Sequence, residues 1–256
     1  MLRRLIKQMA LGLGLGAAGL AGAQVGSVDY ASLSGTVVDF ESLAPSDPDG
    51  SLLEGLLNVG GLQFGERFAG QELAELRALR PGEPAQDWFD NLAFGLPSAG
   101  LSLLAGAAGQ NLGVYDYGDA GGGKTLAGIG PKPGDFAENF GFGAISGRFA
   151  SGQSALGFQV RDADGGQAWL SLYRADGSLI QTLGIAALDN SFYAFARSGG
   201  LADIAGFSLT HSDSYYGIAI DNFKFGSVTA VPEPGSAALL LAGLLTLGGV
   251  ARRRSA

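Results

Sequence analysis

The chain contains no cysteine and a single histidine, His211, in 256 residues. The absence of cysteine excludes a disulfide framework, a thiolate metal site and a cysteine nucleophile. One histidine cannot form a multi-histidine zinc site, and no Gly-x-Ser-x-Gly elbow is present to suggest a serine triad. We interpret His211 as a polar strand or loop residue and expect the hydrophobic core to stabilise the fold, either alone or with the addition of a hard cation.

Positive charge is scarce between the two ends of the chain. Six of the 16 basic residues are Arg3, Arg4, Lys7 and the run Arg252–Arg254, which leaves 10 basic against 24 acidic residues elsewhere. A surface with this balance repels nucleic acid and anionic membranes and favours cations. We therefore predict no nucleic-acid partner.

Residues 1–23 have the three parts of a secretory signal peptide. A basic start is followed by the apolar run from Met9 to Leu20 and by the small residues Ala21 and Ala23, which suit a cleavage site. The run is too short for a comfortable membrane span, and its four glycines weaken a soluble helix. The prediction is export through the Sec translocon, with removal of residues 1–23 by signal peptidase.

Residues 231–256 form a second apolar segment with its own flanking signals. Pro232, Glu233 and Pro234 precede an uncharged stretch from Ser236 to Val250, and the basic run Arg252, Arg253, Arg254 follows. The stretch predicts a marginal transmembrane helix whose arginines stay in the cytoplasm. The prolines prevent the helix from extending upstream and leave an extended segment at the membrane surface.

This tail resembles the PEP-CTERM sorting signal. The resemblance implies that an integral-membrane exosortase recognises the tail and cleaves near Pro232, Glu233 and Pro234. It further implies transient residence in the inner membrane of a Gram-negative bacterium, followed by a place on the cell surface or in the extracellular matrix. A plain C-terminal anchor is the alternative interpretation.

The part between these ends, residues 24–230, has the pattern of an antiparallel β-sandwich. The 44 glycines of the whole chain show no three-residue period, and in this part of the chain single glycines separate alternating apolar runs. The turn Asp176-Gly177 between two such runs is a strong hairpin signal. Strands are predicted at 36–41, 155–160, 168–173, 178–183, 204–210 and 216–225.

One helix is predicted within this domain, from Gln71 to Leu79. Leu73 and Leu76 would share one side, and Pro81 would stop the helix. We expect it to cover one open end of the sandwich. The predicted fold class is thus all-β, a jelly-roll-like sandwich with one short helix, flanked by a signal helix and a transmembrane helix.

The segment from Asn111 to Phe225 resembles the globular part of many PEP-CTERM proteins. The resemblance rests on the runs at 154–158, 162–166, 173–178 and 220–223, in this order. Those domains look like jelly rolls related to carbohydrate-binding modules and lamin-G-type lectins, so the resemblance implies a similar fold here.

Three carboxylates are candidates for a structural calcium site. Asp39 and Glu41 are two apart in a predicted strand, so both would project from one face, and Asp221 lies in the last strand. In jelly-roll carbohydrate-binding modules a Ca²⁺ often joins the first and last strands through such groups, and Ca²⁺ requires six to eight oxygens. The alternative is a solvated acidic face or a cap for a neighbouring loop.

Residues 118–125 match the phosphate-loop pattern letter for letter, from Gly118 to Lys124 and Thr125. That loop requires a helix starting at its lysine, so that backbone amides face the phosphate. Two glycines and two prolines follow within eight residues and forbid such a helix. We interpret the segment as a loop without nucleotide chemistry.

Exposed aromatic rings are the usual means of binding sugars. Tyr215 and Tyr216 are adjacent, so one ring must face outward if they lie in a strand. They are the favoured candidate glycan contacts, together with Trp88. Trp169 fits a core-facing position in its predicted strand, and we assign it to the core.

Three functions remain open. The first is a non-enzymatic exported protein of the cell surface or exopolysaccharide matrix, with glycan binding as its activity. The second is a secreted glycoside hydrolase or lyase, which needs two carboxylates across a cleft. The third is a structural matrix component without a ligand. The first function predicts exposed aromatic rings in a shallow groove, and the second predicts two convergent carboxylates in a pocket. The third predicts neither feature.

The first prediction concerns the ends of the mature protein. Mass spectrometry of the protein recovered from culture should show that residues 1–23 and the tail after Pro234 are missing, because both signals are removed during export. Recovery of the intact chain would contradict both assignments.

Overall fold

A computed structural model describes residues 24–43, 50–79, 87–118, 123–132, 139–163, 165–213 and 217–229, without the side chains of 78, 79, 87 and 88. These residues form an all-β fold in which every strand pair is antiparallel, with two short 3₁₀ turns, η1 Tyr30–Ser32 and η2 Ser198–Gly200. None of the helices in these ranges has the length and apolar character needed to cross a membrane. The predicted signal helix and tail helix both lie outside the described residues.

Nine strands form the larger sheet, here called sheet A. Its main order is β1-β17-β14-β19-β11-β10-β3, with β2 paired to β19 and β12 paired to β11. The bounds are β1 Val25–Ser27, β2 Leu33–Val38, β3 Ser51–Leu53, β10 Leu112–Asp116, β11 Lys124–Ile129, β12 Phe140–Gly143, β14 Ala155–Arg161, β17 Phe192–Arg197 and β19 Ala219–Val228.

Six strands form the second sheet, sheet B, in the order β16-β15-β18-β13-β5-β4. The bounds are β4 Leu57–Val59, β5 Leu62–Gly65, β13 Ile145–Gln153, β15 Gln167–Tyr173, β16 Leu179–Ala186 and β18 Ile204–His211.

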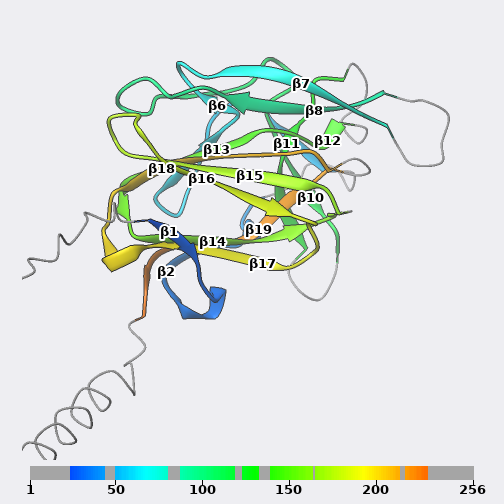
Figure 1. The fold of residues 1–256 in the computed structure, drawn as a ribbon. Coiled ribbons are helices and arrows are strands. Elements are labelled where there is room, and N and C mark those ends of the chain that lie inside the picture. The colour runs from blue at the N-terminus through cyan, green and yellow to red at the C-terminus, as the bar shows by residue number, and fades with distance from the viewer. Residues whose placement is uncertain are drawn as a thin grey trace, which may run out of the picture.

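Two small antiparallel pairs complete the fold. They are β6 Arg67–Phe68 with β9 Leu103–Leu104, and β7 Glu72–Leu79 with β8 Asp87–Phe94. Figure 1 shows the β7–β8 hairpin at the top with strands of sheet B beneath it, and β1, β2, β14 and β17 of sheet A at the bottom, while β11 and β12 of sheet A lie nearer the hairpin. β8 contacts both β18 of sheet B and β12 of sheet A. The hairpin therefore spans from one sheet to the other.

Aromatic side chains join the two sheets in the core. Phe223 of sheet A, fully buried, stacks on Phe207 of sheet B with 4.9 Å between ring centroids. Its edge-to-face partner Phe64, from β5, has its centroid 5.7 Å away. Phe158 stacks on the same ring from within sheet A. Each large buried aromatic contributes several kcal/mol of hydrophobic and packing free energy, of the order of 3–5 kcal/mol when truncated to alanine.

The six strands predicted from alternating runs are confirmed within a few residues at their ends. They correspond to β2, β14, β15, β16, β18 and β19. The predicted hairpin turn between β15 and β16 is also present: Gly177 has φ of 84°, and the amide of Arg174 donates to the carbonyl of Ser178 over 2.9 Å. A residue with a Cβ would be strained at this φ, which explains the glycine.

The helix predicted for Gln71–Leu79 is wrong, because residues 72–79 form strand β7. Each residue of β7 pairs with one of β8, from Glu72 opposite Phe94 to Leu79 opposite Asp87. The guanidinium of Arg77 lies 4.7 Å from the ring centre of its cross-strand neighbour Phe89. Helix propensity favours Glu, Leu, Ala and Arg by only tenths of a kcal/mol per residue, so complete pairing along a hairpin outweighs it.

Candidate functional site

The outer face of sheet B is the surface on which the candidate sites lie. In β15, Ala168, Leu170 and Leu172 are fully buried in the core. Because side chains alternate along a strand, the residues between them, Trp169 and Ser171, must point away from the core. The prediction that Trp169 belongs to the core is therefore wrong.

The middle of this outer face is covered by the segment that carries β6 and β9. Phe68, Leu101 and Leu103 pack there on Tyr173 in a small cluster of their own. Gln71 adds polar contacts, since its amide donates to the Tyr173 hydroxyl over 3.0 Å and accepts from Ser208 Oγ over 3.2 Å. The cover leaves one hollow on either side of it.

The first hollow, here called the Trp169 groove, has a volume of about 430 Å³. Trp169 is half-buried in it, and Phe94 and Leu179 are 49% and 42% exposed at its margin. Gly184 stands opposite Trp169 on β16 and has no side chain of its own, and the Gln167 amide would lie 3.6 Å from a Cβ at that position. The groove is lined by Leu92, Ala93, Phe94, Gly95, Leu96, Trp169, Ser171, Tyr173, Leu179, Thr182 and Thr210.

Hydroxyl groups accompany the aromatic ring in this groove. Ser171 Oγ and Thr182 Oγ1 lie opposite each other on β15 and β16 and share a hydrogen bond of 2.9 Å. Thr210 is paired directly with Trp169 across β15 and β18. The groove thus combines an apolar ring and margin with short donors and acceptors, which is the general composition of small-molecule sites.

The aromatic residues predicted from the sequence as glycan contacts are not among those that line this groove. Tyr215, Tyr216 and the side chain of Trp88 lie outside the described residues, so they stay predictions. The residue that sequence reasoning missed is Trp169. Its signal was Ser171, a polar residue two positions along the same strand and therefore on the same face.

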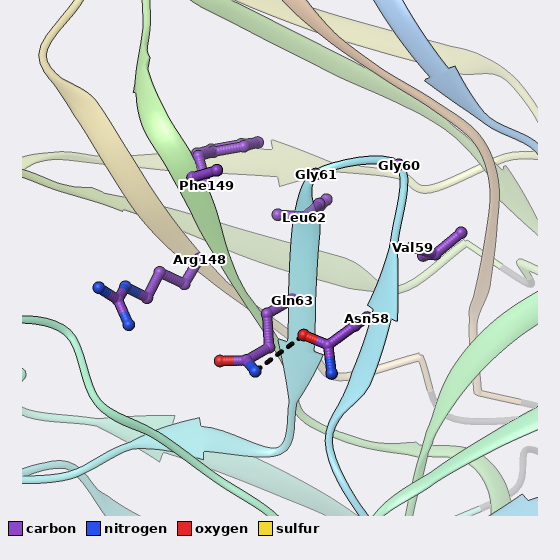
Figure 2. Close-up of a pocket in the computed structure, with 9 residues that line it drawn as sticks. Asn58, Val59, Gly60, Gly61, Leu62, Gln63, Arg148 and Phe149 are labelled. Atoms are coloured by element: carbon purple, nitrogen blue, oxygen red, sulfur yellow. Dashed lines mark hydrogen bonds between the residues drawn. The ribbon is translucent and has the colours of Figure 1, made fainter.

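The second hollow, here called the Arg148 hollow, lies at the other side of the cover and has a volume of about 470 Å³. It is formed by the β4–β5 hairpin and by β13, and Figure 2 shows Gln63 lying between Asn58 and Arg148. Gln63 Nε2 donates to Asn58 Oδ1 over 2.9 Å. The hollow is lined by residues 58–63 and 148–150.

The three candidate calcium ligands are close enough to interact electrostatically. Asp39 and Glu41 follow the end of β2 rather than lying in it, because β2 stops at Val38 and Phe40 has φ of 59°. Burial raises the pKa of Asp221 to about 6, and the charges of Glu41 and Asp39 add to this.

Their oxygens already have protein partners. Asp221 accepts from Asn222 and lies 3.9 Å from Arg161, and Glu41 Oε1 accepts from the amide of Lys124 over 3.0 Å. Within the described ranges no group of three or more His, Cys, Asp or Glu side chains has the arrangement of a metal site. Calcium at these residues stays a prediction from the sequence.

His211 lies at the end of β18, where β8 crosses between the sheets. Its Nδ1 is 3.7 Å from Asp90 Oδ1 of β8, and the side chains are 2% and 1% exposed. Neither oxygen of Asp90 has a hydrogen-bond partner, nor has His211 Nε2. Burial raises the pKa of Asp90 to about 8, with a contribution from Asp213, and burial lowers the pKa of His211 to about 4. Both groups are therefore mainly neutral at pH 7.

The fold and its grooves define a β-sandwich body with one partly covered sheet face. Residues 230–255 match the PEP-CTERM protein-sorting motif, which confirms the tail predicted at 231–256. The motif implies that the protein is exported by a bacterium, processed by exosortase and placed at the cell surface or outside the cell. A comparison with curated proteins found no match to the sequence.

Several solved structures share the sheet-rich architecture at low similarity. The enzymatically active domain of tailspike protein 4 of bacteriophage CBA120 has 18% identity and a TM-score of 0.30, covering 46% of this chain and 18% of its own. The module CsCBM6-3 of Clostridium stercorarium, solved with cellobiose, has 15% identity and a TM-score of 0.27, covering 45% and 81%.

A family 29 carbohydrate-binding module, CBM29-2, has 13% identity and a TM-score of 0.28, covering 64% of this chain and all of its own.

Asp90 generates a prediction about stability and pH. Its folded pKa of about 8 lies above the unfolded value near 3.8, so its contribution is greatest at low pH and is lost as the pH rises through about 8. Asparagine has no carboxyl group to titrate, so the Asp90→Asn variant does not lose this contribution to stability as the pH rises. Denaturant unfolding should show that the free energy of unfolding of the variant rises relative to that of the native protein between pH 5 and pH 8.5, by up to about 1.4 kcal/mol per pH unit.

Asp176→Asn is the control, because Asp176 is exposed and hydrogen bonds from Ser178 lower its pKa. This substitution should change the pH dependence of the unfolding free energy only below about pH 4. Between pH 5 and 8.5 the difference from the native protein should stay constant. A difference between Asp90→Asn and the native protein that stays constant with pH would contradict the buried, neutral acid.

Proposed function

We propose that the protein is a non-enzymatic glycan-binding protein that acts at the cell surface or in the exopolysaccharide matrix of a Gram-negative bacterium. The observation that carries the proposal is the position of Trp169, which the core register turns outward into a groove with hydroxyl-bearing neighbours. Export, implied by the sorting motif, brings such a surface into contact with polysaccharide.

The groove suits a sugar because its surface has two chemical parts. One face of a pyranose ring is lined with C–H groups and stacks on an indole, which removes apolar surface from water. The hydroxyls at the edge of the sugar ring need hydrogen-bond partners. Ser171, Thr182 and Thr210 have hydroxyl groups on short side chains beside the indole. A groove margin formed by Phe94 and Leu179 limits the access of water to such a stack.

The enzyme alternative receives less support from the same geometry. A glycosidase needs two carboxyl groups about 5–10 Å apart facing its substrate. Among the described residues, neither the lining of the Trp169 groove nor that of the Arg148 hollow includes an aspartate or a glutamate. Asp90, whose pKa burial raises to about 8, belongs to β8 of the hairpin, is 1% exposed and lies beside His211 rather than in a groove.

Two further points remain proposals from the sequence. A structural Ca²⁺ at Asp39, Glu41 and Asp221 would stabilise the junction between the segment after β2 and the last strand. A purely structural role in the matrix is the outcome if no glycan binds.

The test is a glycan array on the exported protein, followed by isothermal titration calorimetry with a responding glycan. Trp169→Ala should weaken binding about tenfold or more, equivalent to about 1.4 kcal/mol, because the stacking surface is removed. Phe94→Ala should have a smaller effect in the same direction.

Phe192→Ala is the matched control, since Phe192 is 48% exposed, like Phe94, but lies in β17 of sheet A. Its affinity should equal that of the native protein. If a folded Trp169→Ala variant binds the glycan as tightly as the native protein does, the groove is not the binding site.

A further inference from the structure

The Arg148 hollow contains a polar row that the register of sheet B sets in place. Asn58 of β4 is directly opposite Gln63 of β5, and Gln63 is directly opposite Arg148 of β13. Directly opposite residues of an antiparallel pair project from the same face, with Cβ atoms about 4.5–5.5 Å apart. Three strands thus present an amide, a second amide and a guanidinium side by side (Figure 2).

The hydrogen bond between the two amides decides which of their groups remain available. Gln63 Nε2 donates to Asn58 Oδ1, so Gln63 Oε1 is left as an acceptor and Asn58 Nδ2 as a donor. In Figure 2 the amide oxygen of Gln63 points to the side on which Arg148 lies. The row therefore offers a donor, an acceptor and a cation in sequence.

Arg148 differs from the other arginines whose side chains the structure describes. Arg67, Arg161, Arg174 and Arg197 each have an acidic partner, and Arg77 lies over the ring of Phe89. In the described part of the chain, Arg148 alone among them has no ion pair and is exposed beside a hollow. A guanidinium in this state is suited to a bidentate contact with a carboxylate.

The walls of the hollow leave its mouth open. Gly60 and Gly61 form the two-residue turn between β4 and β5, with φ of 59° and 82°. A Cβ at Gly61 would meet nothing within 4 Å, so the turn adds no bulk above the row. On the other side the row ends at Gly206, opposite Arg148 on β18, over which Phe68 and Leu101 pack. A volume of about 470 Å³ falls in the range of small-ligand pockets.

We infer that the Arg148 hollow is a second binding site, which takes the carboxylate and neighbouring hydroxyls of an acidic sugar such as a uronic acid. Arg148 holds the carboxylate, while Gln63 Oε1 accepts from one hydroxyl and Asn58 Nδ2 donates to another. The choice of a sugar rests on the proposed function, whereas the recognition of a carboxylate rests on this row alone.

The net charge of the protein makes the inference specific. At −8 overall, the protein repels polyanions at long range, so non-specific attraction cannot cause uronate binding. Repulsion from distant charges is screened beyond about 8 Å at physiological ionic strength, whereas a direct guanidinium contact is not. Binding of a uronate therefore requires a local cation in the right place.

The test compares oligogalacturonate with its uncharged methyl ester of the same length, by calorimetry on the exported protein. The native protein should bind the acid at least tenfold more tightly than the ester. Arg148→Gln should remove that preference and leave the affinity for the ester unchanged. Inorganic sulfate serves as a competitor, and displacement of the uronate by sulfate at equal concentration would show a general anion site and overturn the assignment to a carboxylate.

Arg174→Gln is the matched control, because it removes the same charge from a half-exposed arginine that is paired with Asp203. It should retain the preference for the acid. Equal losses in the two variants would show a non-specific charge effect and overturn the inference, as would a native protein that binds acid and ester alike.

The variants also separate this inference from the proposed function. If Trp169→Ala abolishes binding of a neutral glycan but Arg148→Gln leaves uronate affinity unchanged, the Trp169 groove is supported as a glycan site and the Arg148 hollow is not a uronate site. If uronate binding depends on Arg148 while Trp169→Ala has no effect on any glycan, the Arg148 hollow is supported as a uronate site and the Trp169 groove is not a glycan site.

Discussion

The packing of Phe223 between the two sheets is the contact on which the rest of the structure depends. Its ring meets Phe207 and Phe64 of sheet B and Phe158 of sheet A. These contacts select one face of each strand as the inner face. Because the side-chain period of a strand is two, the outward positions follow at once, and a slip by one residue would exchange the two faces. Trp169 and Arg148 are outward for this reason.

The segment between β5 and β10 then decides which outward residues can meet a ligand. Phe68, Leu101 and Leu103 occupy the middle of the outer face, and the amide of Gly100 donates to the carbonyl of Ala175 in the β15–β16 turn. The face is divided into an aromatic groove and a polar hollow on either side. A sugar chain could not lie across the whole face in this arrangement, so we treat the two hollows as separate sites with different chemistry.

Much of the fold could be predicted from local patterns, because the strands alternate cleanly and glycine turns separate them. The turn at Gly177 requires a positive φ, which glycine adopts without strain, so its signal survives in the folded protein. The failure at Gln71–Leu79 has a different cause. Its composition favours a helix, but the segment pairs with the next strand along the chain, and the pairing that outweighs helix propensity is not visible in the composition of one segment.

The candidate sites were harder to predict than the strands. An alternating run shows which residues share a face, but it does not show which face meets the other sheet, and Trp169 was assigned to the wrong one. The row of Asn58, Gln63 and Arg148 comes from three strands, two of them more than 80 residues apart in sequence, and only the register brings these side chains together. No spacing in the sequence indicates such a row.

The central claim is that the indole of Trp169 forms the floor of a glycan-binding groove. The chain has two tryptophans, so Trp88→Phe leaves Trp169 as the sole indole reporter. Acrylamide quenching of its fluorescence should be measured with and without a bound glycan. The account predicts that a half-exposed indole becomes protected as binding saturates. Unchanged quenching at full glycan occupancy would contradict it.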